Sequence, residues 1–464
     1  MATQEKQKDE QLEESLYKKR EKIYPREVHG IFATMRNVAM VALLGIYYGL
    51  PWLQYDGHQA ILFDLPARKF YVFGWTFWPQ DFIYLTALLL IAAYALFFFT
   101  ALAGRLWCGY ACPQTVWTEI FIWIERKFEG SRQKQIKLDK GPWNGERIMR
   151  TGGKHAAWLI FSLFTGFTFV GWFTPIDSLL SDIIIGDISG WGMFWILFYG
   201  FATYGNAGWM REQVCIYMCP YARFQSVMFD KDTLLIAYDE ERGEPRGPRK
   251  KGVDAKASGL GDCINCGLCV QVCPTGIDIR DGLQYQCIGC AACIDVCDEV
   301  MEKVNLPKGL VKYTTEHNIQ GGKTNVLRAR ILVYAALLFI ISGALAYSIA
   351  TRTPLELDII RDRNALYFET DEGMIANVYT LKVINMTNSP QNYTITASGI
   401  EGLTMKMRNE FVDVESGGVV EVPVRLEADP GDLKSASSVV NFTIESNTTE
   451  GLSLTESGRF LGPR

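Results

Sequence analysis

The sequence has little histidine, and this excludes one class of redox centre. Its four histidines are His29, His58, His155 and His317, and none lies inside a long apolar run. A haem buried in a membrane needs axial ligands from helices, typically histidines, so we do not expect a membrane haem. Each histidine is expected at a surface or a membrane interface rather than on a metal.

Three further absences narrow the class of protein. No glycine-rich fingerprint follows a strand pattern, so neither a dinucleotide nor a flavin is expected to bind. No long basic tract with interleaved aromatic residues is present, and the net charge of −5 is modest, so we expect no nucleic-acid partner. The N-terminal segment is charged and has no apolar run, which predicts a solvated cytoplasmic tail over residues 1–32 and no cleaved signal peptide.

The cysteines are confined to the middle of the chain, since all 12 lie between residues 108 and 297. Eight of them form two copies of the spacing C-x-x-C-x-x-C-x-x-x-C, which is that of a bacterial two-cluster ferredoxin. In that spacing the fourth cysteine of each run ligates the other cluster. We therefore expect one 4Fe-4S cluster on Cys263, Cys266, Cys269 and Cys297, and a second on Cys287, Cys290, Cys293 and Cys273.

Competing interpretations of these eight cysteines are weaker. A zinc ribbon would use two C-x-x-C pairs rather than two runs of four. A disulfide framework would need an oxidising compartment. The spacing thus predicts a protein that transfers electrons one at a time.

The other four cysteines form an internal repeat, in which Cys108-Gly-Tyr-Ala-Cys112-Pro113 recurs as Cys215-Ile-Tyr-Met-Cys219-Pro220. The proline favours the first turn of a new helix, so Cys112 and Cys219 are candidates for its N-cap. A thiol at that position has a lowered pKa and is more often a thiolate. Soft thiolates select copper(I), zinc or iron–sulfur units, so the repeat predicts a metal or redox site. The alternative is a set of buried structural cysteines beside a kink.

Five apolar stretches are long enough to span a membrane as helices. They are residues 33–53, 81–103, 157–174, 191–209 and 331–350. The segment between the second and third stretches is rich in Lys and Arg, whereas the next loop carries Asp177, Asp182 and Asp187 and no basic residue. The positive-inside rule then predicts that the N-terminus and residues 210–330 are cytoplasmic, and that the chain after residue 350 is periplasmic.

These patterns predict a multi-domain chain. After the tail at 1–32 we expect a membrane domain at 33–230 with four transmembrane helices and both thiol motifs, and a linker at 231–260. A ferredoxin-like domain with two 4Fe-4S clusters follows at 261–325, and a fifth transmembrane helix at 331–350. Residues 352–464 alternate between short apolar runs, such as 378–384 and 419–426, and polar turn clusters. That pattern is typical of an all-β, Ig-like sandwich.

Several long segments carry a family resemblance. They are Leu62-Phe-Asp-Leu-Pro-Ala-Arg-Lys-Phe-Tyr, Arg105-Leu-Trp-Cys-Gly-Tyr-Ala-Cys-Pro-Gln-Thr-Val-Trp, Asn206-Ala-Gly-Trp-Met-Arg-Glu-Gln-Val-Cys, residues 219–230, and the cluster run that ends Cys297-Asp-Glu-Val. Across essentially its whole length the chain resembles the FixG/RdxA/CcoG family, the iron–sulfur accessory proteins of cbb-type cytochrome c oxidase assembly. It departs from an ordinary two-cluster ferredoxin because Asp298, rather than proline, follows the last cysteine.

The resemblance implies a membrane-bound Cu(II) reductase of the bacterial inner membrane that serves assembly of the oxidase. It implies that Cys108, Cys112, Cys215 and Cys219 are the catalytic thiols where copper meets the electron path. The implied partners are the oxidase assembly machinery, copper chaperones, the lipid membrane and a cytoplasmic electron donor. Two alternatives stay open: a copper-binding assembly scaffold without turnover, and a general membrane electron carrier for another reductase. The second lacks support, because no cysteine or histidine follows residue 317.

Overall fold

The computed structural model describes residues 22–55, 57–248, 259–363, 365–387 and 389–463. The chain divides into two compact units. The first comprises Met1–Leu53 and Leu89–Ile340, and the second comprises Gln54–Leu88 and Ile341–Arg464. Residues 1–21 of the expected N-terminal tail and residues 249–258 of the expected linker lie outside the described residues.

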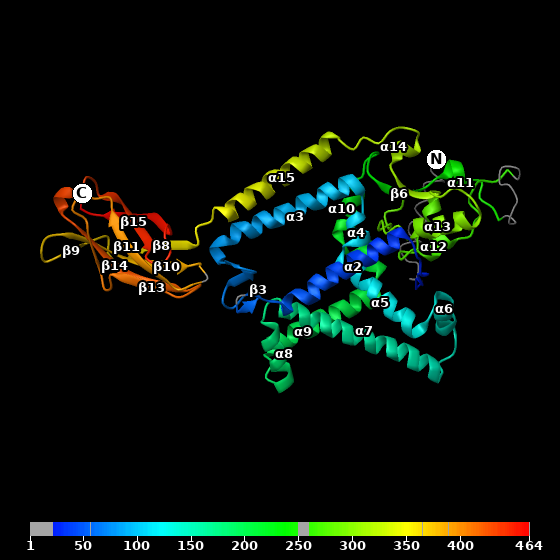
Figure 1. Cartoon of the computed structure of the whole chain (residues 1–464), viewed down its shortest axis with the longest axis horizontal. Coiled ribbons are helices and arrows are strands. Elements are labelled where there is room, and N and C mark those ends of the chain that lie inside the picture. The colour runs from blue at the N-terminus through cyan, green and yellow to red at the C-terminus, as the bar shows by residue number, and fades with distance from the viewer. Residues whose placement is uncertain (1–21, 56, 249–258, 364, 388, 464) are drawn as a thin grey trace, which may run out of the picture. The chain divides into compact units, whose positions relative to one another are not determined.

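Helices make up most of the first unit (Figure 1). The longest are α2 Ile31–Gly49, α3 Phe82–Ala103, α5 Pro113–Glu129, α7 Gly145–Gly171, α9 Gly190–Thr203 and α15 Ala329–Ala350. Shorter ones are α4 Leu106–Tyr110, α6 Arg132–Lys140, α8 Ile176–Ile185 and α10 Pro220–Met228, with π-helical turns at Tyr204–Met210 and Val214–Met218.

Three described helices are long and apolar enough to cross a membrane, namely Ile31–Trp52, Pro79–Ala103 and Ala329–Ala350. A fourth span results if the pair Ile176–Ile185 and Gly190–Met210, bent by 103°, counts as one. The stretch expected at 157–174 is instead the second part of the longer helix α7. That helix begins at Gly145, where the side chain of Asn144 accepts a hydrogen bond from the backbone N–H of Arg147. Lys154 lies inside it, with its charge paired with Glu129 at 2.7 Å. Five spans therefore stay a prediction.

The helices α7 and α9 pack closely through two glycines. A Cβ atom at Gly166 would lie 2.2 Å from the carbonyl oxygen of Ile196, and one at Gly200 would lie 3.2 Å from the Leu163 side chain. Small residues allow helix backbones to approach in this way, as is common in membrane bundles. The contact positions α9 and hence the second thiol motif, which follows it.

The ferredoxin part of the first unit contains two short strands and several helices. They are β6 Leu235–Tyr238, α11 Glu240–Gly243, α12 Leu268–Gln271, α13 Ala292–Lys303, β7 Val311–Thr314 and α14 Glu316–Ile319. Strand β6 pairs antiparallel with β7, and its Ile236 and Tyr238 lie in the core of this part. The segment expected as a linker therefore contributes a strand and core side chains to the ferredoxin fold, because its short apolar run pairs with β7.

The second unit is a β-sandwich, as expected from the alternating pattern after residue 352. One sheet has the order β12-β14-β10-β8, with β9 beside β10, and the other has the order β13-β11-β15-β16. Large side chains from both sheets fill the space between them, including Tyr379, Tyr393, Phe442 and Phe460. The strands are β8 Leu355–Arg361, β9 Phe368–Glu369, β10 Ile375–Asn385, β11 Gln391–Ser398, β12 Thr404–Met407, β13 Phe411–Val414, β14 Val419–Ala428, β15 Ser437–Ser446 and β16 Ser453–Leu461.

The second unit also includes a segment from the N-terminal half of the chain. Its strands are β1 Gln54–Tyr55, β2 His58–Gln59, β3 Ile61–Asp64, β4 Lys69–Val72 and β5 Trp75–Phe77. The ammonium group of Lys69 donates to the carbonyl oxygen of Gly417 at 2.7 Å, and Trp78 packs with Ile384 and Met386. These contacts attach the segment to the sandwich.

Candidate iron–sulfur centres and thiol site

The four cysteines predicted for the first cluster line one small cavity. Cys263, Cys266, Cys269 and Cys297 border it together with apolar side chains such as Leu310 and Met301. Two of the thiols lie in the loop before α12, a third is in α12 itself, and Cys297 comes from α13. The fold therefore brings a cysteine of the second run to three cysteines of the first, which is the arrangement that the spacing predicts.

A second small cavity lies beside the first. Cys273, Cys287, Cys290 and Cys293 line it with Ile236, Ile279 and Ile288, and Cys269 borders both cavities. The shared wall places the two candidate cluster sites next to each other. An electron could thus pass between two clusters held there without leaving the protein interior.

The backbone of both loops is shaped to hold an anionic group. On either side of Cys266, the second cysteine of the first run, Asn265 and Gly267 have φ of 51° and 63°. On either side of Cys290, the second cysteine of the second run, Gly289 and Ala291 have φ of 69° and 59°. Residues that alternate between right- and left-handed conformations turn successive N–H groups towards one concavity, as in many iron–sulfur sites. The two loops therefore share a geometry that fits a cluster, in addition to four thiol donors each.

Among the described residues, no three His, Cys, Asp or Glu side chains converge on a single metal ion. A 4Fe-4S cluster offers a separate iron to each thiolate, so its ligands need not meet at one point. Burial raises the pKa of Cys290 and of Cys297 to about 12, and that of Cys269 to about 11. Without metal these thiols are neutral, and cluster binding must release their protons.

Both thiol motifs have the local structure expected from their prolines. Cys112 is the N-cap of α5 with Pro113 in its first turn, and Cys219 is the N-cap of α10 with Pro220 in its first turn. The first cysteine of each motif lies in the preceding short helical segment, Cys108 in α4 and Cys215 in the turn Val214–Met218. The two copies are thus built alike, and the predicted N-caps are confirmed.

The expected lowering of thiol pKa at these N-caps is wrong for Cys112. Burial raises its pKa, although the backbone N–H groups of Thr115 and Gln114 act in the opposite direction. Desolvation of the thiolate outweighs the favourable helix N-terminus at this depth. Burial likewise raises the pKa of Cys108 to about 12 and that of Cys215 to about 11.

The fold brings the two motifs together. The charge of Cys108 would interact with those of Cys112 and Cys215, and the charge of Cys112 would interact with that of Cys219. The four thiols therefore lie near one another, in a region that we call the four-thiol site, although no three of them converge on one metal ion in the described part of the chain. The thiol of Cys108 donates to the side-chain oxygen of the buried Gln225 at 3.2 Å. Sequence reasoning had no means to establish this meeting.

The four-thiol site lies against the loop of the second candidate cluster. A Cβ atom at Gly109, next to Cys108, would lie 2.8 Å from the carbonyl oxygen of Gly289 and 3.0 Å from the Cα atom of Cys290. The buried Arg105 donates to the carbonyl oxygens of Tyr285 and Cys287 on one side and of Ala222 in α10 on the other. Backbone contact and a shared arginine thus join the two redox sites.

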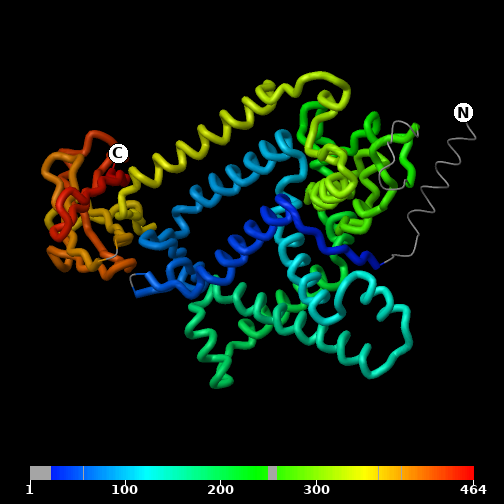
Figure 2. Tube along the Cα trace, turned by 45° about the vertical axis from the view of Figure 1, so that its right-hand side comes forward, coloured from blue at the N-terminus to red at the C-terminus, as the bar shows by residue number. Residues whose placement is uncertain are grey.

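Two aspartates in α13 have structural roles that the sequence did not reveal. The carboxylate of Asp295 accepts hydrogen bonds from the backbone N–H groups of Phe32 and Ala33, at 3.2 and 2.7 Å, and so caps the start of α2. Both views show this start of α2, in blue, beside the ferredoxin part (Figures 1 and 2). Asp298 accepts from the backbone N–H of Gly309 at 2.8 Å.

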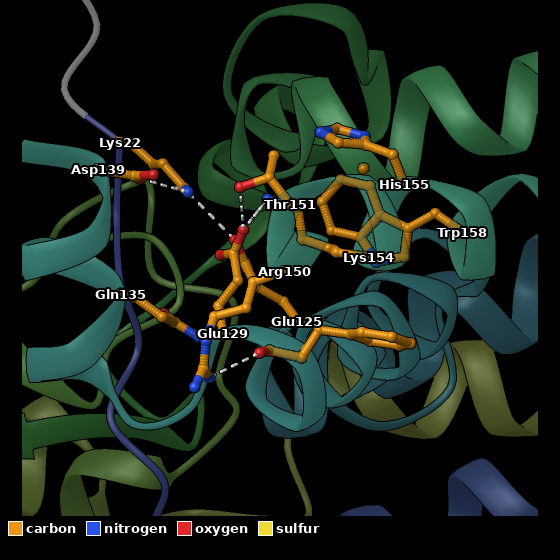
Figure 3. Close-up of polar contacts among 12 residues, drawn as sticks. Lys22, Glu125, Glu129, Gln135, Asp139, Arg150, Thr151, Lys154, His155 and Trp158 are labelled. Atoms are coloured by element: carbon orange, nitrogen blue, oxygen red, sulfur yellow. Dashed lines mark hydrogen bonds and ion pairs between the residues drawn. The ribbon is translucent and has the colours of Figure 1, made fainter. Parts of the chain in front are cut away.

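A buried charge cluster lies between α5 and α7 (Figure 3). Glu125 is 2.7 Å from Arg211, 3.1 Å from Lys22 and 3.7 Å from Lys154. Lys154 also pairs with Glu129 at 2.7 Å. Lys22 and Tyr24 both donate to Asp139 of α6, at 2.8 and 2.6 Å, so the cluster fastens the segment before α2 to these helices. None of these roles follows from a local sequence pattern.

Taken together, a two-cluster ferredoxin fold, apolar membrane-type helices and a C-terminal sandwich define a membrane-associated iron–sulfur electron-transfer protein. A family model described as "4Fe-4S dicluster domain" matches residues 210–316, and one described as "4Fe-4S binding domain" matches residues 85–130. A model of the Ig-like fold at the C-terminus of FixG matches residues 345–463.

Relatives extend over most of the chain. Protein RdxB of Cereibacter sphaeroides is 41% identical over 407 residues, which are 85% of this chain and 85% of that protein. The nitrogen fixation protein FixG of Rhizobium meliloti is 37% identical over 85% of this chain and 82% of its own length. A crystal structure of a FixG-related protein from Vibrio parahaemolyticus is 31% identical and covers 23% of this chain and 95% of its own, with a TM-score of 0.22. The chain belongs to the FixG/RdxA family.

Proposed function

We propose that this iron–sulfur oxidoreductase reduces Cu(II) to Cu(I) at the four-thiol site, and that the product serves assembly of a cbb-type cytochrome c oxidase. The observation that carries the proposal is the contact of Gly109 with Gly289 and Cys290. It brings Cys108 beside the loop that is expected to hold the second cluster. When bound, each cluster supplies one-electron storage and transfer.

The chain's own residues have distinct parts in this proposal. The eight ferredoxin cysteines hold the clusters, and Arg105 keeps the second cluster loop against α4 and α10. The four thiols receive copper as the substrate. Thiolates prefer Cu(I) to Cu(II), so reduction converts bound copper to the oxidation state that these ligands bind more tightly.

The placement in the cell is also part of the proposal. It follows the charge pattern of the loops, which predicts a cytoplasmic ferredoxin part and a periplasmic sandwich in a bacterial inner membrane. The sandwich would then contact the oxidase assembly machinery or a copper chaperone. Family membership supports an electron-transfer role, and the soft donors of the four-thiol site support copper as the acceptor.

An anaerobic reduction experiment tests the proposal. The purified chain is reduced with dithionite, the excess is removed, and Cu(II) is added with a Cu(I)-specific chelator. We expect cluster reoxidation and Cu(I) formation with equal amplitudes, up to about two electrons per protein, since each of two clusters holds one. A variant with serine at positions 108, 112, 215 and 219 should keep its iron and its reduction by dithionite but lose Cu(I) formation.

Each opposite result has a defined meaning. Copper that binds while the clusters stay reduced would establish a scaffold without turnover. Full Cu(I) formation in the four-serine variant would place copper reduction elsewhere on the chain.

A further inference from the structure

A cavity of about 530 Å³ lies between the second candidate cluster and the four-thiol site. Cys290 and Pro274 of the ferredoxin part line one side, and Cys215 with Arg211 lines another. Residues of α2 and α5 complete the wall. A ligand in this cavity would therefore contact residues of both redox sites, a position that suits an electron donor or acceptor.

The lining suits an apolar molecule with a polar head. Apolar side chains predominate, among them Met40, Ile122 and Trp123. Polar groups line the rest of the wall, among them Asn37, Gln114 and Thr118 together with charged side chains such as Arg36, Arg126 and Glu119. The amide nitrogen of Gln114 donates to the carbonyl oxygens of Asn206 and Arg211, and no donor among the described residues reaches its side-chain oxygen. A cavity that combines apolar surface with polar groups able to orient a ligand is typical of small-molecule sites.

The position of the cavity favours a ligand that is soluble in lipid. One wall is α2, which is a candidate membrane span and whose Met35, Val38 and Val41 are exposed on its outer surface. Opposite, the segment Ile23–His29 covers the cavity. Hydrogen bonds fix this segment, from Arg132 to the carbonyl oxygen of Tyr24 and from the N–H of Arg26 to the carbonyl oxygen of Gln271.

We infer that this cavity binds an isoprenoid quinol of the membrane, which supplies the electrons to this protein. The inference rests on the proposed electron-transfer function and replaces the cytoplasmic donor expected from the sequence. Oxidation of one quinol to the quinone releases two electrons and two protons. The two electrons reduce the two clusters by one electron each, and two Cu(II) ions then take one electron each.

The protons released by the quinol follow a separate path in this proposal. A second cavity, of about 360 Å³, has Glu125, Lys154 and His155 in its lining and shares Ile23 and Arg211 with the quinol cavity. The two hydroxyl protons leave through this cavity to water. The side-chain oxygen of Gln114 accepts a hydrogen bond from one quinol hydroxyl, and Asn37 and Thr118 supply donors to the quinone that forms.

Binding is tested first, without turnover. The full chain with both clusters oxidised is titrated by calorimetry with decylubiquinone and with a short-chain menaquinone, and one equivalent of at least one quinone should bind. Met40→Trp fills the cavity from α2 and should weaken binding by about tenfold or more. Met35→Trp on the exposed side of the same helix should bind as the unmodified chain does. Asn37→Leu, nearly isosteric, should weaken binding without filling the cavity.

Electron transfer is tested next, with the corresponding quinol under anaerobic conditions. Cluster absorbance should bleach by up to two electrons per protein, and Met40→Trp should slow this bleaching but not reduction by dithionite. Absence of quinone binding, equal binding in both tryptophan variants, or a phospholipid retained in the cavity in its place overturns the inference. Copper reduction by dithionite-reduced protein is measured separately. If copper is reduced but no quinone binds, the quinol inference is wrong and the proposed function stands. If quinol bleaches the clusters but no Cu(I) forms, the quinol inference stands and the proposed copper reduction is wrong.

Discussion

The guanidinium group of Arg105 donates a hydrogen bond from Nη1 to the main-chain carbonyl oxygen of Cys287, at 3.2 Å. The side chain is 6% exposed, so its charge is hardly shared with solvent. That charge favours the thiolate forms of Cys287, Cys108 and Cys215. One buried cation thus acts on both the second candidate cluster and the four-thiol site, and it belongs to the residues that join them.

Arg105→Gln should lower the reduction potential of the second cluster. A buried positive charge stabilises the reduced, more negative cluster, by about 1.7 kcal/mol at roughly 10 Å and an effective dielectric constant of 20. For one electron this corresponds to roughly 70 mV. A redox titration followed by electron paramagnetic resonance measures the shift. Arg105→Lys keeps the charge and should keep most of the potential, so equal potentials in the two variants would contradict an electrostatic role.

Gly109→Ala should slow electron transfer from the clusters to copper while the clusters are retained. The new Cβ would lie 2.8 Å from the carbonyl oxygen of Gly289, so α4 and the cluster loop must move apart. Overpacking of this kind costs about 1–3 kcal/mol. Stopped-flow reoxidation by Cu(II), with iron content measured alongside, checks the prediction. Gly205→Ala is the control, because its Cβ meets no atom within 4 Å. Equal rates in the two variants would show that this contact does not limit transfer.

The local parts of this structure could be predicted from the sequence. Ligand spacing in a ferredoxin is a property of a short segment, and all eight predicted cysteines lie in two cavities in the expected sets. The N-caps Cys112 and Cys219 were predictable for the same reason, since each depends only on the proline that follows. Alternation of apolar residues, a pattern with a period of two, was enough to indicate the sandwich.

The remaining features depend on contacts between distant residues. The cap that Asp295 provides for α2 joins residues 262 positions apart, and the bond from Lys69 to Gly417 joins residues 348 apart. The hydropathy pattern predicted that Lys154 lies in a loop between two spans. In the structure it is 4% exposed and pairs with Glu129 inside the helical region. The prediction of a lowered pKa for Cys112 was wrong because it took account of the helix N-terminus but not of the burial of the thiol.

Glu125→Gln should destabilise the protein strongly. It removes the acidic partner of Arg211, Lys22 and Lys154, and loss of one member of a buried ion pair typically costs about 3–5 kcal/mol. The midpoint of thermal unfolding in detergent measures the effect. Glu146→Gln is the matched control, because the pair of Glu146 with Arg150 is exposed and worth about 0.3–0.5 kcal/mol. Similar losses in both variants would mean that the buried cluster adds no specific stability.

The same carboxylate predicts a pH dependence. Burial opposes ionisation of Glu125, but the charges of Arg211, Lys22 and Lys154 outweigh it, so its pKa lies below the usual value of 4.5. A lowered pKa stabilises the folded state above the unfolded-state pKa, and this stabilisation is lost as pH falls through the folded-state pKa. Thermal stability should therefore decline below pH 4.5 more steeply in the unmodified chain than in Glu125→Gln. Parallel pH profiles would assign the acid sensitivity to other groups.

Trp78→Ala should loosen the segment Gln54–Phe77 from the sandwich of the second unit. Trp78 is 7% exposed and packs with Ile384 and Met386, and the ammonium group of Lys69 lies 4.9 Å from the centre of its ring. Truncation of a buried tryptophan costs about 3–5 kcal/mol, so backbone amides of this segment should exchange hydrogen faster in the full chain. Trp75→Ala, at a side chain 60% exposed, should leave exchange unchanged. If both variants exchanged alike, the bond from Lys69 to the carbonyl oxygen of Gly417 would have to hold the segment without the tryptophan.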